Sequence, residues 1–363
     1  MPIVTFSRLL LLPALIAGWC TATHAQPRAE RRGSGTAVLR DFRFVAGDTL
    51  SELRVHYVAL GQPRRDSRGT VRNAVLVLHG TGGAGQGFLS RNFAGELFGP
   101  GKLLDTARFY VILPDGIGHG KSSKPSDGRR ARFPRYTYDD MVAAQHRLLT
   151  EHLGVDHLRL IMGTSMGCMH AWVWGYTHAN FADGLVPLAC LPTQIAGRNR
   201  MLRTMLMDNI RTDPAWKGGE YGEPPPGLRA ALEILFIMSS APLVQQAQAP
   251  TRDAADSVIR TYLDQRMRAT DANDLLYAMD ASRDYDPSPH LERITTPVLF
   301  INSHDDLLNP PELGLAERLT ARLPRARFVN LPISPATRGH GTHSLPAIWG
   351  GYLAEFLKDL PER

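Results

Sequence analysis

The sequence predicts an α/β fold with a mostly parallel, doubly wound sheet and an inserted helical cap. Short runs that are wholly or nearly apolar recur along the chain, as expected for parallel strands covered on both faces. Segments of helical character, notably residues 138–153 and 166–176, lie between these runs. Alternating strands and helices are typical of a doubly wound sheet. The apolar runs cover residues 74–78, 110–113, 158–162, 184–188 and 297–301.

The alternation breaks between residues 192 and 286, which we interpret as a helical cap inserted after a strand. This stretch is rich in Met, Ala, Leu and Arg, contains the proline run 224–226, and has helical more than strand periodicity. The α/β core is then predicted in two parts, residues 37–191 and 287–363. The length of 363 residues suffices for one large core.

Residues 1–25 have the pattern of a cleavable secretory signal peptide. Arg8 precedes a short apolar run at 9–18, and the triplet Thr-His-Ala at 23–25 supplies a cleavage site. The run is shorter than the roughly 20 apolar residues that a bilayer-spanning helix needs, so no stable membrane anchor is predicted. We therefore expect a secreted or periplasmic protein.

The exported chain is expected to begin with a disordered segment and then an antiparallel hairpin. Residues 26–36 are polar and rich in Arg and Gly, which predicts disorder. Two β-rich runs follow at 41–45 and 53–60, with the turn residues Gly47 and Asp48 between them.

The charge pattern argues against nucleic acid as a partner. The net charge is +6, but the basic residues are scattered and are not interleaved with aromatic side chains. Cleavage of the signal peptide would remove Cys20 and leave Cys168 and Cys190. These two can pair in an oxidising compartment if their distance allows, or remain as two small buried thiols.

The strongest catalytic motif is the pentapeptide Gly-Thr-Ser-Met-Gly at 163–167. It matches G-x-S-x-G, follows an apolar strand and opens a helix, which is the context that this motif requires. A tight strand-to-helix turn lifts the serine hydroxyl out of the sheet, and the helix start favours developing negative charge. A chance match in a glycine-rich turn is the alternative, and the context argues against it. Ser165 is therefore the predicted nucleophile.

A second motif, His-Gly-Thr-Gly-Gly at 79–83, directly follows another apolar strand. Acyl transfer needs two N–H donors for the developing oxyanion, and we assign them to Thr81 and Met166. A phosphate-binding loop is the alternative. The Lys-Ser/Thr of a P-loop and the pattern G-x-G-x-x-G are both missing, so no cofactor is predicted.

An acid and a base must follow in the order Ser, Asp, His. The candidates come after predicted strands at 297–301 and 327–331, where open α/β sheets build their sites. The histidine would take the proton from the serine, and the aspartate would fix its tautomer. A metal site at the His-x-x-His spacing is the alternative, but it lacks a matching ligand cluster. The candidate residues are Asp305, Asp306, His340 and His343.

Several segments in order resemble the homoserine O-acetyltransferase-like branch of the α/β hydrolases. The elbow at 163–169 is similar to that family's G-G-S-M-G-G-M. The segment 306–312 is similar to D-W-L-F-P-P-E, and this resemblance favours Asp306 over Asp305. Gly339 and His340 are similar to G-H-D, which favours His340 over His343. Further similar segments lie at 133–142, 153–155 and 211–221.

The resemblance implies the α/β-hydrolase fold and the Ser165, Asp306 and His340 triad. It also implies a homodimer through the cap, because the family's enzymes often form one. Two departures argue against the family's substrate. Met207 stands where its transferases carry a substrate-binding arginine, and a secreted protein would not meet acetyl-CoA.

Together these features predict a secreted serine hydrolase that acts on small carboxylic esters through an acyl-enzyme. The first alternative is an O-acyltransferase of the homoserine O-acetyltransferase-like type, because both reactions begin with attack by Ser165. The second alternative is a non-catalytic binding protein on a hydrolase scaffold. That alternative predicts the loss of a triad residue, and all three are present.

Overall fold

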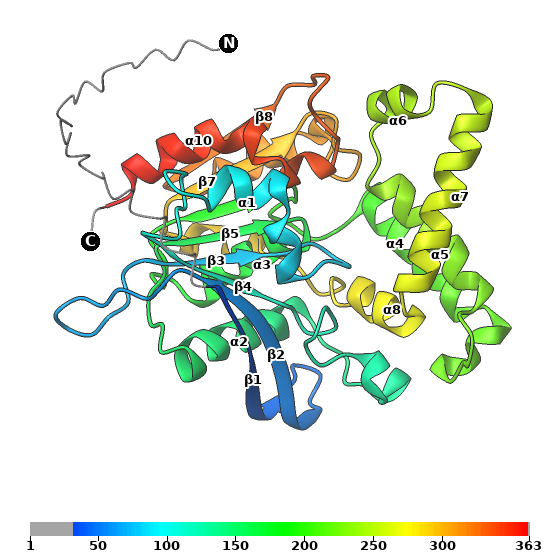
Figure 1. Cartoon of the computed structure of the whole chain (residues 1–363), viewed down its shortest axis with the longest axis horizontal. Helices are drawn as coiled ribbons and strands as arrows, with labels where there is room; N and C mark the ends of the chain where they lie inside the picture. Colours follow the sequence, from blue (N-terminus) through cyan, green and yellow to red (C-terminus); the bar gives the residue numbers. More distant parts are fainter. Residues whose placement is uncertain (1–31, 362–363) are drawn as a thin grey trace, which may run out of the picture.

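The computed structural model describes residues 32–361, so the predicted signal peptide lies outside the described residues. Eight strands form one sheet in the order β1-β2-β4-β3-β5-β6-β7-β8 (Figure 1). The pairs β1–β2 and β2–β4 are antiparallel and the others are parallel, which confirms the predicted fold class. The strands are β1 (Arg32–Arg43), β2 (Thr49–Leu60), β3 (Ala74–Leu78), β4 (Tyr110–Pro114), β5 (Leu160–Thr164), β6 (Leu185–Leu188), β7 (Val298–Ser303) and β8 (Ala326–Leu331).

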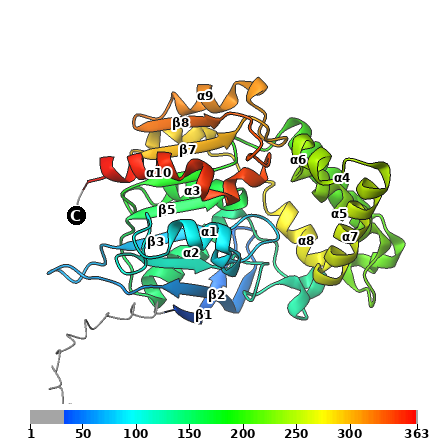
Figure 2. The same cartoon turned by 45° about the horizontal axis from the view of Figure 1, so that its top comes forward.

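Helices cover both faces of this sheet and account for the apolar strands. In β3, Leu76 and Leu78 point into one buried cluster while Val75 and Val77 point into the other, because successive strand side chains alternate between faces. The first cluster packs beneath α2 (Tyr138–Arg147), α3 (Met166–Thr177) and α9 (Leu315–Thr320). The second packs beneath α1 (Arg91–Leu97) and α10 (Pro346–Asp359), which lie side by side in Figure 2.

The N-terminal strand is longer than predicted. Residues 32–36 were expected to be disordered, but they form the start of β1 and pair with residues 56–60 of β2. That part of the prediction is wrong. The hairpin itself is present, with Gly47 at a positive φ of 100° in its turn. β1 is an edge strand, so polar residues such as Ser34 and Thr36 are exposed while the backbone keeps its ladder.

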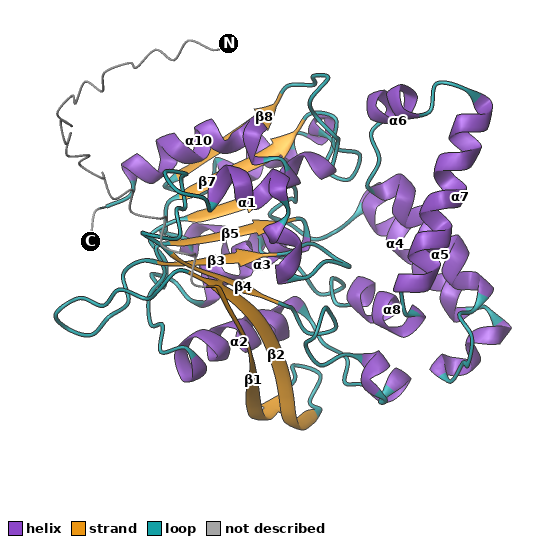
Figure 3. Cartoon of the chain, viewed as in Figure 1, coloured by secondary structure: helices purple, strands orange, loops and turns teal. Residues whose placement is uncertain are grey.

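Five helices lie between β6 and β7 in the chain and stand beside the sheet in Figure 3. They are α4 (Gly197–Arg211), α5 (Pro226–Met238), α6 (Pro242–Gln248), α7 (Arg252–Ala269) and α8 (Ala272–Asp280). These helices, called the cap below, have a small apolar cluster of their own, which includes Leu206, Leu232 and Leu263. Within residues 32–361, no single helix is long and apolar enough to cross a membrane. α5 and α6 reach that threshold only as a pair bent by 108°.

Short helices complete the described chain. A π-helical turn, η4 (Leu148–His152), extends α2, so the predicted helix at 138–153 is two elements of different geometry. The 3₁₀ helices are η1 (Gly85–Leu89), η2 (Pro125–Asp127), η3 (Arg130–Arg132), η5 (Pro214–Gly219), η6 (Ser288–Arg293), η7 (Pro311–Leu313) and η8 (Gly341–Ser344).

Candidate active site

Ser165 lies at the sharp turn between β5 and α3. Its backbone has φ 53° and ψ −109°, a conformation that residues other than glycine rarely adopt. Glycines make the turn feasible: a Cβ on Gly167 would collide with the Leu78 carbonyl, and one on Gly163 would collide with Gly167. The Ser165 N–H donates to the Leu188 carbonyl at 2.9 Å. Close packing of backbone therefore holds the serine in a strained turn at the carboxyl edge of the sheet.

His340 joins Ser165 to Asp306 in one hydrogen-bonded chain. The His340 Nε2 lies 2.8 Å from the Ser165 Oγ, and its Nδ1 lies 2.9 Å from the Asp306 Oδ2. A carboxylate can only accept, so the hydrogen-bond network assigns the proton to Nδ1. Nε2 is then free to accept the serine proton. The chain Ser165–His340–Asp306 thus has the geometry of a nucleophile, a general base and an orienting acid.

The Asp306 carboxylate is completely buried and is held from several sides. It accepts hydrogen bonds from the Leu308 N–H at 2.8 Å and from the Asn309 side-chain amide at 2.8 Å. Burial alone would raise the pKa of Asp306. The His340 ring and the hydrogen bonds outweigh this and hold that pKa below its usual value. Asp306 is therefore ionised at neutral pH and able to stabilise a positive imidazole ring.

The two alternative candidates, Asp305 and His343, are not part of the hydrogen-bonded triad. Asp305 accepts from the Ser303 hydroxyl and from the Gly339 N–H at 3.0 Å, so it braces the loop just before His340. The His343 Nδ1 lies 2.9 Å from the Ser344 hydroxyl, and its ring packs edge-on against His340. Burial, together with the neighbouring His340, lowers the pKa of His343 to about 3. His343 is thus a neutral packing partner of His340.

The glycine-rich loop at 79–83 passes directly beside Ser165. A Cβ on Gly80 would lie only 3.2 Å from the Ser165 Cβ. His79 fixes this loop, because its Nε2 accepts from the Gly116 N–H and its Nδ1 then donates to the Gly80 carbonyl. Thr81 lines a cavity with Ser165, and Met166 is the first residue of α3. Both residues assigned to the oxyanion site are therefore next to the serine.

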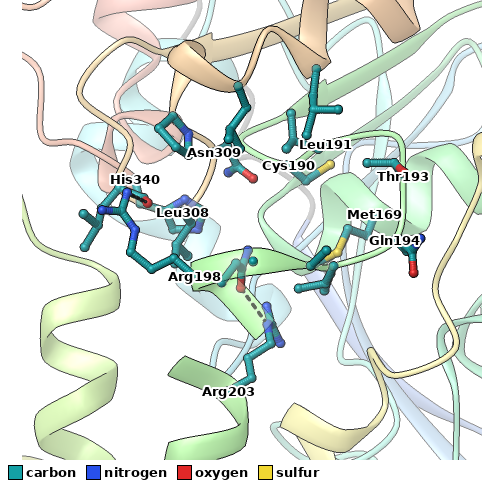
Figure 4. Close-up of a pocket in the computed structure, with 18 of the residues that line it drawn as sticks. Met169, Cys190, Leu191, Thr193, Gln194, Arg198, Arg203, Leu308, Asn309 and His340 are labelled. Carbon is teal, nitrogen blue, oxygen red and sulfur yellow. Dashed lines mark hydrogen bonds between the residues drawn. The ribbon is translucent and has the colours of Figure 1, made fainter. Parts of the chain in front are cut away.

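Two cavities open at Ser165. The larger, of about 560 Å³, is lined mainly by apolar side chains such as Met169, Leu191 and Ile195. The smaller, of about 370 Å³, runs along the glycine-rich loop toward α5 and α7. The residues that line both cavities are Ser165, Arg203, Leu308 and His340. Figure 4 shows His340, Arg203 and Cys190 around the larger cavity. The site can accordingly hold a substrate on two sides of the serine hydroxyl.

Cys168 and Cys190 form a disulfide. The sequence left this pairing open, and the structure places the two Cα atoms 5.9 Å apart. Cys168 lies on α3, three residues after Ser165, and Cys190 follows β6 and lines the larger cavity. The disulfide therefore ties the helix of the serine to a wall of the cavity.

Arg203 is the site residue that the sequence interpretation missed. It lies on α4, one helical turn before Met207, which is buried in the cap cluster and lines neither cavity. Its position in the helical repeat could have identified it. Arg203 shares one helix face with Leu206 and Ile210, so it is an arginine on an otherwise apolar stripe. An arginine at such a position is expected to be buried and to have a functional role.

No group of three or more His, Cys, Asp or Glu side chains within residues 32–361 is arranged to hold a metal ion.

Sequence comparison places residues 73–332 in the family described as alpha/beta hydrolase fold. A homoserine O-acetyltransferase from Haloarcula marismortui is 32% identical over 252 residues, 62% of this chain and 60% of that protein. The match thus spans less than two thirds of the length of the Haloarcula protein. A homoserine O-acetyltransferase from Haloferax volcanii is 32% identical over 299 residues, which cover 69% of each chain.

Solved structures share the whole fold. Homoserine O-acetyltransferase from Bacillus anthracis superimposes with a TM-score of 0.79 at 21% identity, covering 91% of this chain and 99% of that one. An acetylester hydrolase from Corynebacterium glutamicum superimposes with a TM-score of 0.77 at 21% identity, covering 90% and 95%. Such structural likeness at low identity shows the shared fold.

The family match and the relatives confirm the resemblance found in the sequence. The chain belongs to the α/β hydrolase fold family, in its homoserine O-acetyltransferase-like branch, and is an enzyme, either a hydrolase or an acyltransferase.

Proposed function

We propose that this chain is an exported serine hydrolase that cleaves carboxylic esters. The observation that carries the proposal is the hydrogen-bonded chain Ser165–His340–Asp306, with its serine on a strained turn that opens into two cavities. A serine hydroxyl is a weak nucleophile until a neighbouring base takes its proton. The His340 Nε2, at 2.8 Å, is within reach of that proton.

The first half of the reaction forms an acyl-enzyme. His340 accepts the Ser165 proton as Oγ attacks the ester carbonyl carbon, and the carbonyl oxygen becomes negatively charged. The N–H groups of Thr81 and Met166 stabilise this oxyanion. As the intermediate collapses, the C–O bond to the alcohol breaks and His340 gives its proton to the departing alkoxide. Asp306 stabilises the imidazolium that exists between these steps.

The second half regenerates the serine. Water enters the space that the alcohol has left, and His340 takes one of its protons as its oxygen attacks the acyl carbon. Collapse of the second intermediate breaks the bond to Ser165 Oγ, which recovers its proton from His340. The products are one carboxylic acid and one alcohol for each ester and each water consumed.

Two observations favour water over an alcohol as the acyl acceptor. The signal-peptide pattern at residues 1–25 predicts export, and the Cys168–Cys190 disulfide fits an oxidising compartment. Acetyl-CoA is a cytosolic donor that an exported enzyme would not meet. The acetylester hydrolase from Corynebacterium glutamicum is an example of ester hydrolysis on this fold.

An O-acyltransferase is the second candidate function. It is favoured by the relatives from Haloarcula marismortui and Haloferax volcanii, both named homoserine O-acetyltransferase. The acyl-enzyme step is the same in both functions, so only the acceptor separates them.

The test is ester turnover by the exported, purified protein and by Ser165→Ala. We expect 4-nitrophenyl acetate and butyrate to be hydrolysed, with a loss of roughly 10⁴-fold or more in kcat in the variant. A fluorophosphonate should label Ser165 in the wild-type protein only. Product that forms only with acetyl-CoA and an alcohol would favour the transferase instead. An unlabelled serine with no turnover of either kind would contradict both candidates.

A further inference from the structure

Arg203 is a buried cation at the centre of the proposed site. Only 3% of its surface is exposed, although it belongs to the cap helix α4 and not to the sheet. It lines both cavities together with Ser165 and His340. Figure 4 shows its side chain reaching into the larger cavity from α4. A substrate that occupies either cavity at the serine can therefore extend to this guanidinium.

The groups that form hydrogen bonds with Arg203 are all neutral, and the nearby Arg200 has the same positive charge. Its Nε donates to the Asn199 side-chain carbonyl at 3.0 Å, and its Nη1 donates to the Ser282 hydroxyl at 3.2 Å and contacts the Met279 sulfur at 3.6 Å. No carboxylate within residues 32–361 forms an ion pair with it. Burial raises the pKa of the nearby Tyr138, so this phenol is neutral as well. The charge of Arg203 is held in place but not compensated.

An uncompensated charge is costly to bury, because the protein interior replaces water as its surroundings. A buried arginine with no acid partner is therefore expected where an incoming anion supplies the missing charge. Only a few well-placed polar groups orient a ligand in a mainly apolar cavity. Arg203 is such a group in the larger cavity, among side chains such as Met169, Ile195 and Leu308.

Positive side chains outnumber negative ones in the rest of the lining. Besides Arg203, the two cavities are lined by Arg198 and Arg266, and by a single carboxylate, that of the exposed Glu312. The smaller cavity has Arg203 and Arg266 in its lining and no carboxylate. The guanidinium of Arg266 lies at the glycine-rich loop, since a Cβ on Gly82 would be 3.5 Å from it. These cations attract negatively charged ligands toward Ser165.

We propose that the substrate of this enzyme is an ester that itself carries a carboxylate, and that Arg203 binds that carboxylate. The planar fork of a guanidinium matches a carboxylate with two parallel N–H···O bonds. One buried guanidinium balances one negative charge, which favours a carboxylate over a phosphate dianion. The inference rests on the proposed function and names the substrate class of the same site. Arg203 is thus a specificity-determining residue on the cap.

The test uses pairs of esters that differ only in a carboxylate. Mono-4-nitrophenyl succinate and 4-nitrophenyl butyrate have the same leaving group and acyl chains of the same length. 4-Acetoxybenzoate and its methyl ester place the charge on the alcohol side instead. We expect the wild-type protein to prefer the charged member of one pair at least tenfold in kcat/KM. Arg203→Met should lower kcat/KM for that member by roughly a hundredfold and for its neutral partner by less than threefold.

Two further variants isolate the role of the guanidinium. Arg203→Lys keeps the charge but loses the fork, so we expect it to recover part of the preference. Arg211→Met removes one exposed positive charge from the same helix, and Arg211 lines neither cavity. We expect Arg211→Met to leave the ratio between charged and neutral esters unchanged.

The outcomes separate the two proposals. An equal loss for charged and neutral esters in Arg203→Met would overturn this inference and leave the proposed hydrolase in place. If Arg203→Met does not fold, a protection experiment on the wild-type protein tests the inference instead. Succinate should protect Ser165 against fluorophosphonate labelling at concentrations at least tenfold lower than succinamide, and equal protection would overturn the inference. A serine that does not label at all would overturn the proposed function itself.

Discussion

The two sides of the site differ in how they are held. On the sheet side, the conformations of Ser165, His340 and Asp306 are fixed by close-packed backbone, by buried hydrogen bonds and by the disulfide near the serine. On the cap side, the helices pack around a small cluster of their own and leave side chains such as Met201 and Leu243 exposed. The difference indicates that the two sides have separate roles in catalysis. The sheet edge supplies the reaction, and the cap supplies the selection of substrates.

The contacts between the two sides support this division. Many of them are hydrogen bonds and ion pairs at the surface, such as Arg135 with Asp280 at 3.3 Å and Ser126 with Asp274 at 2.7 Å. Exposed pairs of this kind contribute at most about 1 kcal/mol each to stability. Changes in the cap should therefore alter selection and local stability more than they alter the chemistry at Ser165.

The largest expected effect of a further substitution lies on the sheet side, in Asp306→Asn. An amide in place of the carboxylate favours the wrong tautomer of His340 and cannot stabilise its positive form. By analogy with serine proteases, we expect kcat for ester hydrolysis to fall by about 10⁴-fold. Asp305→Asn serves as the control, with a much smaller loss, because Asp305 braces only the loop at Gly339. Equal losses in steady-state kinetics would contradict the assignment of Asp306.

On the cap side, Leu232→Ala should affect stability more than chemistry. Leu232 is fully buried in the cap cluster, so its truncation leaves a void and should cost about 2–5 kcal/mol in the free energy of unfolding. Urea denaturation measures that loss. We expect kcat for a neutral ester, corrected for the folded fraction, to change less than threefold. A loss as large as that in Asp306→Asn would show that the two sides are not separable.

The last effect appears only below neutral pH and concerns a buried histidine of the sheet side, His119. Burial, together with the neighbouring His79, lowers the pKa of His119 to about 3. In the unfolded chain that pKa is about 6.5, so below this pH the unfolded state binds a proton that the folded state does not. Stability is therefore fully present above pH 6.5 and declines as the pH falls toward 3.

His119→Gln removes this titration and tests the prediction. The slope of unfolding free energy against pH should become shallower by up to about 1.4 kcal/mol per pH unit between pH 6 and pH 4. Urea denaturation at several pH values gives that slope for both proteins. An unchanged slope would mean that His119 is protonated in the folded state.

Much of the sheet side could be predicted from the sequence because its signals are local. The apolar run at 74–78 is β3 without any shift, since a strand buried on both faces leaves no room for polar residues. The G-x-S-x-G context placed the turn at Ser165 for a similar reason, because the backbone crowding there admits only glycine on either side. The order of motifs also indicated Asp306 and His340, which the structure brings to the serine.

The remaining features depend on contacts between distant segments. Residues 32–36 belong to β1 because β2 provides a partner for their backbone, which the composition of this segment does not reveal. The pairing of Cys168 with Cys190 depends on a distance of 5.9 Å between Cα atoms, which no spacing in the sequence shows. Arg203 was overlooked because its burial follows from how α4 packs against α8, where Met279 and Ser282 receive its side chain.

The disulfide also has a mechanical consequence. It closes a loop with a sequence separation of 22 residues that contains most of α3 and all of β6. When the chain is pulled from its two ends, the force passes through the sulfur–sulfur bond and the residues inside the loop bear no load. The oxidised protein should therefore extend roughly 75 Å less on complete unfolding than the reduced protein, at about 3.5 Å for each shielded residue. The segment that follows the serine is thus a part of the fold that tension does not reach while the disulfide is intact.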